Sequence, residues 1–120
     1  MLKKCLAVLM PFVLVSCGQG DVDENIVIDN NSKVIDVRTE KEYQAGHLKN
    51  AINIPHTMIK EKIEDYVKDK DERIALYCHS GRRSGIAQNI LKEMGYKNVI
   101  NAGAYEKLKK QEEERERQKE

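Results

Sequence analysis

The feature that most constrains the fold is a regular alternation of short β-rich runs with helical patterns. The β-rich runs are dominated by Ile and Val and occupy residues 26–28, 34–37, 51–54, 73–77 and 98–100. Helical patterns separate or follow them at residues 39–45, 58–67, 83–94 and from 105 onward. This order predicts an α/β domain with a mainly parallel central sheet flanked by helices. In such sheets, functional residues gather at the carboxyl ends of the strands.

The helical patterns carry their own start and stop signals. Thr39, followed three residues later by Glu42, predicts a capping box, and Gly95 stands where the helix at 83–94 would end. Apolar spacing predicts the faces that these helices bury. We expect one buried face to hold Ile59, Ile63, Tyr66 and Val67, and another to hold Ile86, Ile90, Leu91 and Met94.

The first residues have the composition of an export signal. A positive segment at 1–4 precedes an apolar run at 5–15 that is too short to span a bilayer as a helix. The run ends in Leu-Val-Ser-Cys at 14–17, which resembles the lipobox of bacterial lipoproteins. The resemblance implies lipidation of Cys17, cleavage just before it, and a membrane-anchored protein at the periplasmic face or cell surface. Ordinary signal cleavage nearby and an uncleaved anchor are the alternatives.

The chain of 120 residues therefore divides into a signal peptide at 1–16, a polar tether at 17–24, one domain at 25–108 and a charged helical tail at 109–120. About 100 residues remain after the signal, which suffices for one domain with one modest core. The tail has no apolar stripe, so we do not expect a coiled coil. Lys and Arg number 21 against 20 Asp and Glu, so the charge balance gives no basic footprint for nucleic acid.

Cys78 is the residue that most invites a chemical role. It follows the β-rich run 73–77 and opens the loop Cys-His-Ser-Gly-Arg-Arg-Ser at 78–84. Backbone amides of the loop, the positive end of the next helix and two arginines each lower the pKa of a thiol. A cysteine after an apolar strand is also commonly a small core residue. The glycine and paired cations favour the thiolate, because a core cysteine needs neither.

The other two cysteines leave Cys78 without a partner in the mature chain. Cys5 is removed with the signal peptide, and Cys17 carries the lipid. Disulfides are favoured in exported proteins, so an unpaired cysteine there calls for a chemical explanation.

Two groups of residues together resemble the rhodanese domain. The first is Ile-Asp-Val-Arg at 35–38 with Glu42-Tyr43, Gly46-His47-Leu48, Ala51 and Asn53-Ile54-Pro55, and the second is the loop at 78–84. The match runs in the expected order from about residue 34 to residue 108 and looks like a single-domain rhodanese of the exported bacterial kind. One segment departs: Ala104 stands at the family's second glycine and Leu108 at its usual aromatic residue.

This resemblance implies a rhodanese-like three-layer fold and a thiosulfate sulfurtransferase with Cys78 as nucleophile and persulfide carrier. The donor would be a small anion such as thiosulfate, and the acceptor cyanide or a thiol. Arg82 and Arg83 can offset the charge of a dianion. The predicted substrate-binding residues are His79, Ser80, Gly81, Arg82 and Arg83, with Asp36, Arg38 and Ser84 in support. We expect no cofactor and no metal, since no residue cluster has metal-ligand spacing.

Several residues keep two interpretations. His79 can raise the local positive potential or act on a proton, or do neither as an exposed loop residue. Asp36 and Arg38 form either a structural salt bridge and turn network or a wall of the pocket. Glu42 and His47 are more simply structural, with His47 bonding backbone groups near the turn that follows.

Three other functions fit the sequence less well. A thiol-redox, persulfide-sensing or carrier module would use the same cysteine without thiosulfate turnover, although no resolving cysteine is expected in the mature chain. A non-catalytic interaction module is usually marked by loss of the cysteine, which is retained here. Cysteine phosphatases place an arginine six positions after the cysteine, whereas Arg83 lies five after Cys78 and position six is Ser84.

Overall fold

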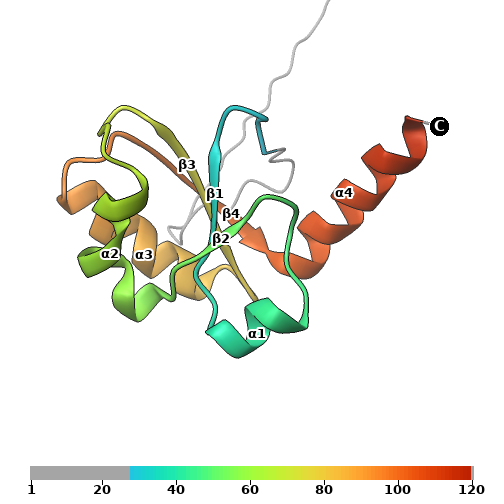
Figure 1. Cartoon of the computed structure of the whole chain (residues 1–120), viewed down its shortest axis with the longest axis horizontal. Coiled ribbons are helices and arrows are strands. Elements are labelled where there is room, and N and C mark those ends of the chain that lie inside the picture. The colour runs from blue at the N-terminus through green and yellow to red at the C-terminus, as the bar shows by residue number, and fades with distance from the viewer. Residues whose placement is uncertain (1–27, 120) are drawn as a thin grey trace, which may run out of the picture.

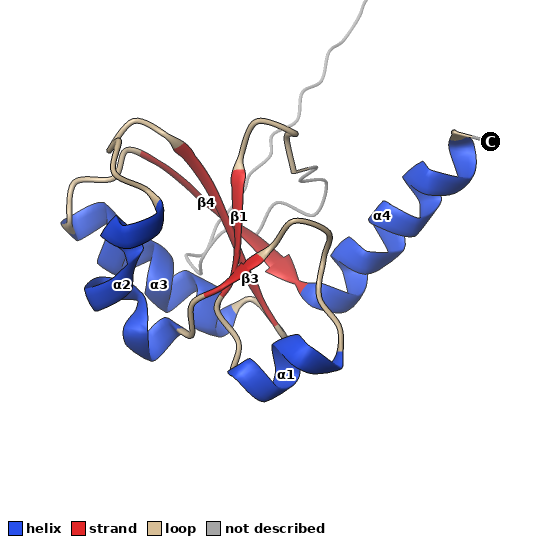
Figure 2. Ribbon diagram, in the orientation of Figure 1, coloured by secondary structure: helices blue, strands red, loops and turns tan. Residues whose placement is uncertain are grey.

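The structure is a computed structural model that describes residues 28–119 (Figure 1). Its elements follow one another as β1 (Lys33–Asp36), α1 (Glu40–Ala45), β2 (Ile52–Asn53), the 3-10 turn η1 (His56–Met58), α2 (Ile59–Tyr66), β3 (Arg73–Cys78), α3 (Arg82–Glu93), β4 (Asn98–Ala104) and α4 (Tyr105–Gln118). Strands and helices alternate, as Figure 2 shows, and the expected α/β class is confirmed. The expected strand at 26–28 lies outside the described residues except for Ile28, which is not in a strand.

The strands form one sheet in the order β2-β1-β3-β4, and every neighbouring pair is parallel. All carboxyl ends therefore lie at one edge, which is the lower edge in Figure 1, next to α1. Cys78 is the last residue of β3, and Arg38 follows β1 closely. The topology thus brings the two candidate segments of the sequence to the same edge of the sheet.

Successive side chains of a strand point to opposite faces of the sheet, so the buried side chains form one core on each face. Along β3, Leu76 and Cys78 face the same core as α2 and α3, whereas Ala75 and Tyr77 face the opposite side. Leu108 of α4 is buried on that opposite side. Helices therefore cover both faces, which makes three layers.

Two residues expected in buried helix faces are exposed instead. Tyr66 is 46% exposed because α2 ends there and the next residue, the buried Val67, already has extended backbone. Ile86 is 38% exposed, since α3 turns Ser84, Ala87 and Leu91 toward the core. The apolar pattern alone did not show that a serine belongs to the buried face.

The predicted helix signals are otherwise confirmed. Thr39 caps α1: its side chain accepts the Glu42 N–H at 3.2 Å, and its own N–H donates to the Glu42 carboxylate at 3.1 Å. After α3, Gly95 has φ 102°, a left-handed conformation that ends a helix at little cost for glycine.

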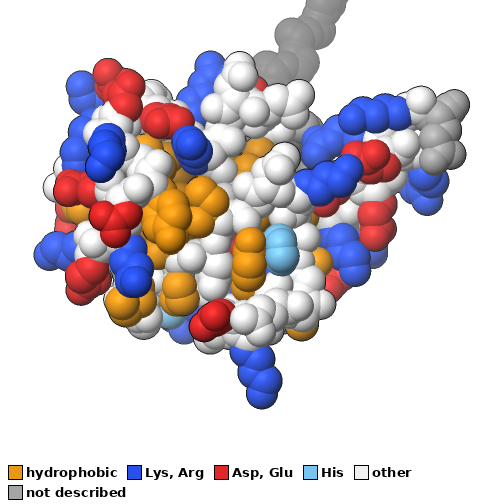
Figure 3. Space-filling model, in the orientation of Figure 1, with side chains coloured by type: hydrophobic (Ala, Val, Ile, Leu, Met, Phe, Trp, Pro, Cys, Tyr) orange, Lys and Arg blue, Asp and Glu red, His pale blue; other side chains and the backbone are white. Residues whose placement is uncertain are grey.

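Helix α4 runs without a break through the charged C-terminal segment to Gln118. The boundary predicted between Leu108 and Lys109 therefore lies inside one helix. Acidic and basic side chains are intermixed on this part of the surface in Figure 3, and Lys49 contacts the helix through Glu112 and Glu116. Within residues 28–119, no helix is both long and apolar enough to cross a membrane.

Candidate active site

The Cys78 thiol lies at the floor of the loop between β3 and α3. Its Sγ accepts the N–H of Gly81 at 3.0 Å and the N–H of Ser84 at 3.4 Å. Backbone donors from the third and sixth residues after the cysteine therefore converge on one sulfur atom. The cysteine is free and 0% exposed. A sulfur-donating substrate therefore reaches the thiol only if the groups that cover it move.

Gly81 gives the loop its tight turn. It has φ 99°, in the left-handed region that side-chain-bearing residues rarely adopt, and it is the residue before α3. Its carbonyl accepts the N–H of Gly85 at 3.0 Å, the first hydrogen bond of the helix. One glycine therefore starts α3 and turns its own N–H toward the sulfur.

Two opposing effects set the pKa of Cys78. Burial raises it, because a buried thiolate loses its hydration. Hydrogen bonds from the Ser84 side chain and from the backbone of Ser84, Gly81 and Ser80 lower it, and their sum prevails. The pKa of the thiol is therefore below its ordinary value, as expected for a nucleophile at neutral pH.

Asn101 is a buried member of this site that the sequence analysis missed. Its Nδ2 donates to the Gly81 carbonyl at 2.9 Å, and its Oδ1 lies 2.6 Å from the Ser84 hydroxyl. The same hydroxyl lies 3.5 Å from the Cys78 Sγ. Asn101 therefore holds the Ser84 hydroxyl beside the sulfur, where it adds to the two backbone donors in lowering the pKa of Cys78. The signal in the sequence was Asn101 itself, a polar residue at a core-facing position of a strand, which indicates a buried polar contact.

A β-bulge between β3 and β4 aims the Asn101 side chain. Leu76 pairs with Asn101 and Tyr77 with Gly103, so Ala102 is an extra residue on β4. At the bulge, the Gly103 N–H donates to the Asn101 side-chain oxygen at 3.1 Å. The interrupted ladder leaves the amide facing Gly81 and Ser84.

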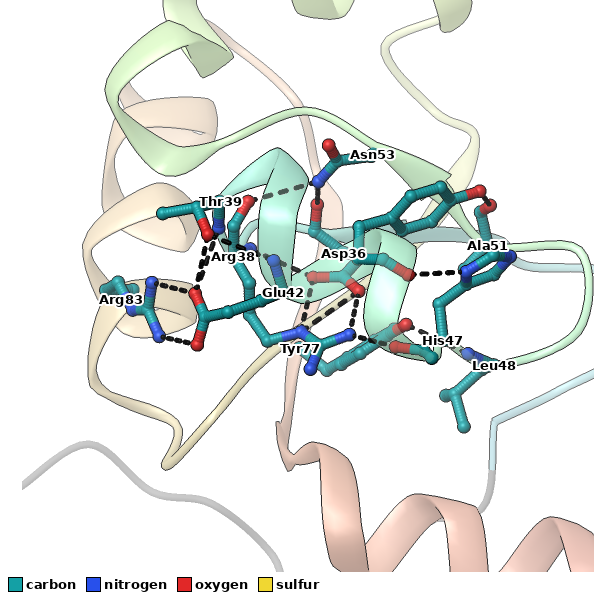
Figure 4. A network of polar contacts seen from close by, with 12 residues as sticks. Asp36, Arg38, Thr39, Glu42, His47, Leu48, Ala51, Asn53, Tyr77 and Arg83 are labelled. Carbon is teal, nitrogen blue, oxygen red and sulfur yellow. Dashed lines mark hydrogen bonds and ion pairs between the residues drawn. The ribbon is translucent and has the colours of Figure 1, made fainter.

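Asp36 and Arg38 form a buried network at the end of β1 (Figure 4). The guanidinium Nη2 donates to the Asp36 carboxylate at 2.6 Å and to the Gly46 carbonyl at 2.7 Å. It also lies over the Tyr105 ring, 4.3 Å from the ring centre. A Cβ on Gly46 would lie 3.0 Å from the Tyr105 hydroxyl, so a larger residue here would push the tyrosine ring from its place over Arg38. The expected salt bridge and turn network is present.

Arg83 is paired with Glu42 rather than free in the loop. Figure 4 shows its guanidinium facing the carboxylate of α1, with N–O distances of 2.9 and 3.1 Å. Hydrogen bonding from Arg83 is the largest influence on Glu42 and lowers the pKa of that carboxyl to about 2. The carboxylate is therefore ionised at neutral pH.

The remaining predicted residues lie around the loop surface. His79, Ser80 and Arg82 are exposed, and none of the ion pairs found in residues 28–119 includes Arg82. His47 has the backbone contact expected of it: its Nδ1 lies 2.9 Å from the Tyr43 carbonyl, and its ring stacks on that tyrosine.

Two surface pockets lie away from the loop. One of about 430 Å³ lies between Ile28–Val34 and α4, and one of about 410 Å³ lies beside Ile100. Neither is lined by Cys78 or by its loop. No group of three metal-ligating side chains is gathered in the part of the chain that the structure describes.

A hydrogen-bonded thiol of lowered pKa at the carboxyl edge of a parallel sheet defines a class of α/β domains with a reactive cysteine loop. The chain belongs to the rhodanese-like domain family, whose model matches residues 19–111. The three-layer rhodanese-like fold expected from the sequence is thereby confirmed.

Two curated relatives and one solved structure illustrate the similarity. Thiosulfate sulfurtransferase PspE of Escherichia coli (strain K12) is 51% identical over 69 residues, 58% of this chain and 66% of the relative. Putative sulfur carrier protein YrkF of Bacillus subtilis (strain 168) is 38% identical over 73 residues, 61% of this chain and 38% of the relative. The match thus spans less than two thirds of either relative. The structure described as "rhodanese with anions from E. coli" has a TM-score of 0.62 and 46% identity, covering 63% of this chain and 89% of that one.

Proposed function

We propose that this protein is a thiosulfate sulfurtransferase that passes sulfane sulfur through a persulfide on Cys78. The observation that carries the proposal is the convergence of the Gly81 and Ser84 N–H groups on a thiol of lowered pKa. A relative that is 51% identical is named a thiosulfate sulfurtransferase, and the similar solved rhodanese is described as holding anions.

The first half-reaction is an attack of the Cys78 thiolate on the outer sulfur of thiosulfate. A Cys–S–S bond forms, the S–S bond of thiosulfate breaks, and sulfite leaves with the electron pair. The loop amides that hold the thiolate also stabilise the persulfide anion, which carries the same charge. The exposed Arg82 supplies positive charge at the mouth of the loop, where the dianion approaches.

The second half-reaction restores the enzyme. Cyanide or a thiolate attacks the outer sulfur of the persulfide, and the Cys78 thiolate departs as the leaving group. The products are thiocyanate or a new persulfide. Because sulfite leaves before the acceptor binds, the kinetics are ping-pong.

The test is incubation with thiosulfate followed by intact-mass measurement and a cyanide-acceptor assay. We expect the mass to increase by one sulfur atom, and Cys78→Ser to abolish both the added mass and thiocyanate formation. Ser32→Ala is a control that removes a hydroxyl outside the cysteine loop and should leave both readouts unchanged. Turnover by the Cys78→Ser protein would overturn the proposal.

A persulfide carrier or sensor is the second candidate, favoured by the relative that is named a putative sulfur carrier protein. A carrier accepts sulfur from a protein or low-molecular-weight persulfide but does not cleave thiosulfate. Loading of Cys78 by a persulfide donor, with no loading by thiosulfate, would decide for this function.

We further propose that the chain is exported and anchored in a membrane by lipid on Cys17, with residues 17–24 as the tether. The support is the apolar run at 5–15 and the residues that end it. Cys17→Ala should release the protein from the membrane fraction and abolish incorporation of labelled fatty acid. Cys5→Ala, a matched cysteine within the signal, should change neither. Unchanged membrane retention of Cys17→Ala would contradict the proposal.

A further inference from the structure

Glu42 reaches the cysteine loop from a different part of the fold. It lies in the first turn of α1, and its partner Arg83 lies in the first turn of α3, next to the Ser84 that donates to the Cys78 sulfur. Both carboxylate oxygens accept from the guanidinium, at 2.9 and 3.1 Å. The Glu42 carboxylate therefore covers the edge of the Arg83 guanidinium that carries Nη1 and Nη2.

The negative charge of Glu42 is not needed for the start of α1. Its Oε1 accepts the Thr39 N–H at 3.1 Å, a cap contact that a neutral glutamine makes equally well. Its Oε2 contacts only Arg83 among its hydrogen-bond partners in residues 28–119. The negative charge of Glu42 therefore acts chiefly on Arg83.

Arg83 precedes Ser84, whose N–H donates to the Cys78 sulfur at 3.4 Å, so it lies close to the thiol in the fold. Its pKa is raised first by the hydrogen bond to Glu42, and also by the charges of Glu42 and Cys78. The pair is also accessible to solvent, with 21% of the Arg83 side chain and 35% of the Glu42 side chain exposed. An anion near Cys78 therefore competes with Glu42 for the same guanidinium.

We propose that Glu42 determines donor specificity by withholding Arg83 from doubly charged sulfur donors. The inference rests on the proposed function and refines it. With Arg83 paired to Glu42, the loop offers an incoming dianion the charge of Arg82 but not that of Arg83. A monoanionic thiosulfonate reacts by the same step: the thiolate attacks its outer sulfur, the S–S bond breaks, and a sulfinate leaves with the electron pair.

The closing experiment measures the potential at Cys78 without turnover. The rates of alkylation by iodoacetate, an anion, and by iodoacetamide, its neutral analogue, are compared for the unaltered protein and for Glu42→Gln. The ratio of the two rates cancels any change in the thiolate fraction. We expect Glu42→Gln to raise the ratio by about threefold to tenfold at low salt, and by less at high salt.

Two variants keep this test specific. Glu40→Gln makes the same charge change on the same turn of α1, where the carboxylate accepts from Gln44 at 3.4 Å and has no ion pair within the described residues. Its ratio should stay near that of the unaltered protein. The double variant Glu42→Gln with Arg83→Gln restores the original net charge of the pair, so its ratio should return toward the starting value. An unchanged ratio in Glu42→Gln, or an equal rise in Glu40→Gln, overturns the inference.

A turnover arm separates the inference from the proposed function. Relative to methanethiosulfonate, thiosulfate should gain about threefold to tenfold in kcat/KM in Glu42→Gln. If the unaltered protein turns over neither donor, the proposed function fails, while the alkylation ratio still decides the role of Glu42. Matching circular dichroism spectra of Glu42→Gln and the unaltered protein show that the fold is intact.

Discussion

Two arginine–carboxylate pairs lie at the same edge of the sheet, and they differ chiefly in burial. The Arg38 and Asp36 side chains are 6% and 0% exposed, whereas those of Arg83 and Glu42 are 21% and 35% exposed. Arg38 also donates to the Gly46 carbonyl and lies over an aromatic ring, while Arg83 contacts one carboxylate. The Arg38–Asp36 pair therefore stabilises the fold, whereas Arg83 can exchange Glu42 for an incoming anion.

The largest effect on stability should come from Asp36→Asn. It leaves the Arg38 guanidinium buried without a counter-charge, and breaking a buried pair costs about 3–5 kcal/mol in the free energy of unfolding. Urea denaturation followed by circular dichroism measures this loss. A cost below that of Glu42→Gln would show that burial does not separate the two pairs.

Asn101→Ala should have an intermediate effect. It removes the buried amide that donates to the Gly81 carbonyl and accepts from the Ser84 hydroxyl, which costs about 1–3 kcal/mol. The loosened loop should also raise the pKa of Cys78, so the pH profile of iodoacetamide alkylation should move to higher pH. Gln88→Ala is a matched control, because it removes an amide from α3 that donates to the Val99 carbonyl away from the sulfur. An unshifted profile in Asn101→Ala would count against this role.

Glu42→Gln should cost no more than about 1 kcal/mol at neutral pH, because its pair is partly solvated. The folded-state pKa of Glu42 is lowered from 4.5 to about 2, so its ionisation stabilises the fold above pH 4.5. That contribution is lost as the pH falls from 4.5 to about 2. The difference in stability between Glu42→Gln and the unaltered protein should shrink across this range. A difference independent of pH would mean that the ion pair does not contribute.

The smallest effect should come from Lys49→Ala, which removes an exposed contact to Glu116 on α4. The midpoint of denaturation should not change measurably, because exposed ion pairs contribute little. A clear loss of stability would show that the charged end of α4 is held to the domain more firmly than its exposure indicates.

The sequence predicted most of this fold because its signals are local. Alternating Ile and Val runs identified the strands that the structure describes, and Thr39 with Glu42 identified the start of α1. The Cys78 loop was located by its glycine and arginines, whose positions relative to the cysteine are fixed by the chain itself.

The missed features depend on contacts between distant segments. Glu42 and Arg83 are 41 residues apart, and no local pattern pairs a capping carboxylate with a loop arginine. Asn101 is 17 residues from Ser84, and a β-bulge, not an apolar period, directs its side chain. The buried side of α3 was misjudged at Ile86 because a serine near the sulfur takes a core position.

The extra residue Ala102 has a consequence on both faces of the sheet. Before it, Asn101 lies opposite Leu76, whose side chain faces α3; after it, Gly103 lies opposite Tyr77, which faces the other way. The inserted residue thus reverses which face of the sheet the following residues of β4 point toward, just before α4 begins with Tyr105. Deleting Ala102 would remove the bulge and shift Tyr105, whose ring lies against the Arg38 guanidinium, relative to Asn101, whose amide contacts Gly81 and Ser84. The single inserted residue therefore sets the position of the Arg38 network relative to the cysteine loop.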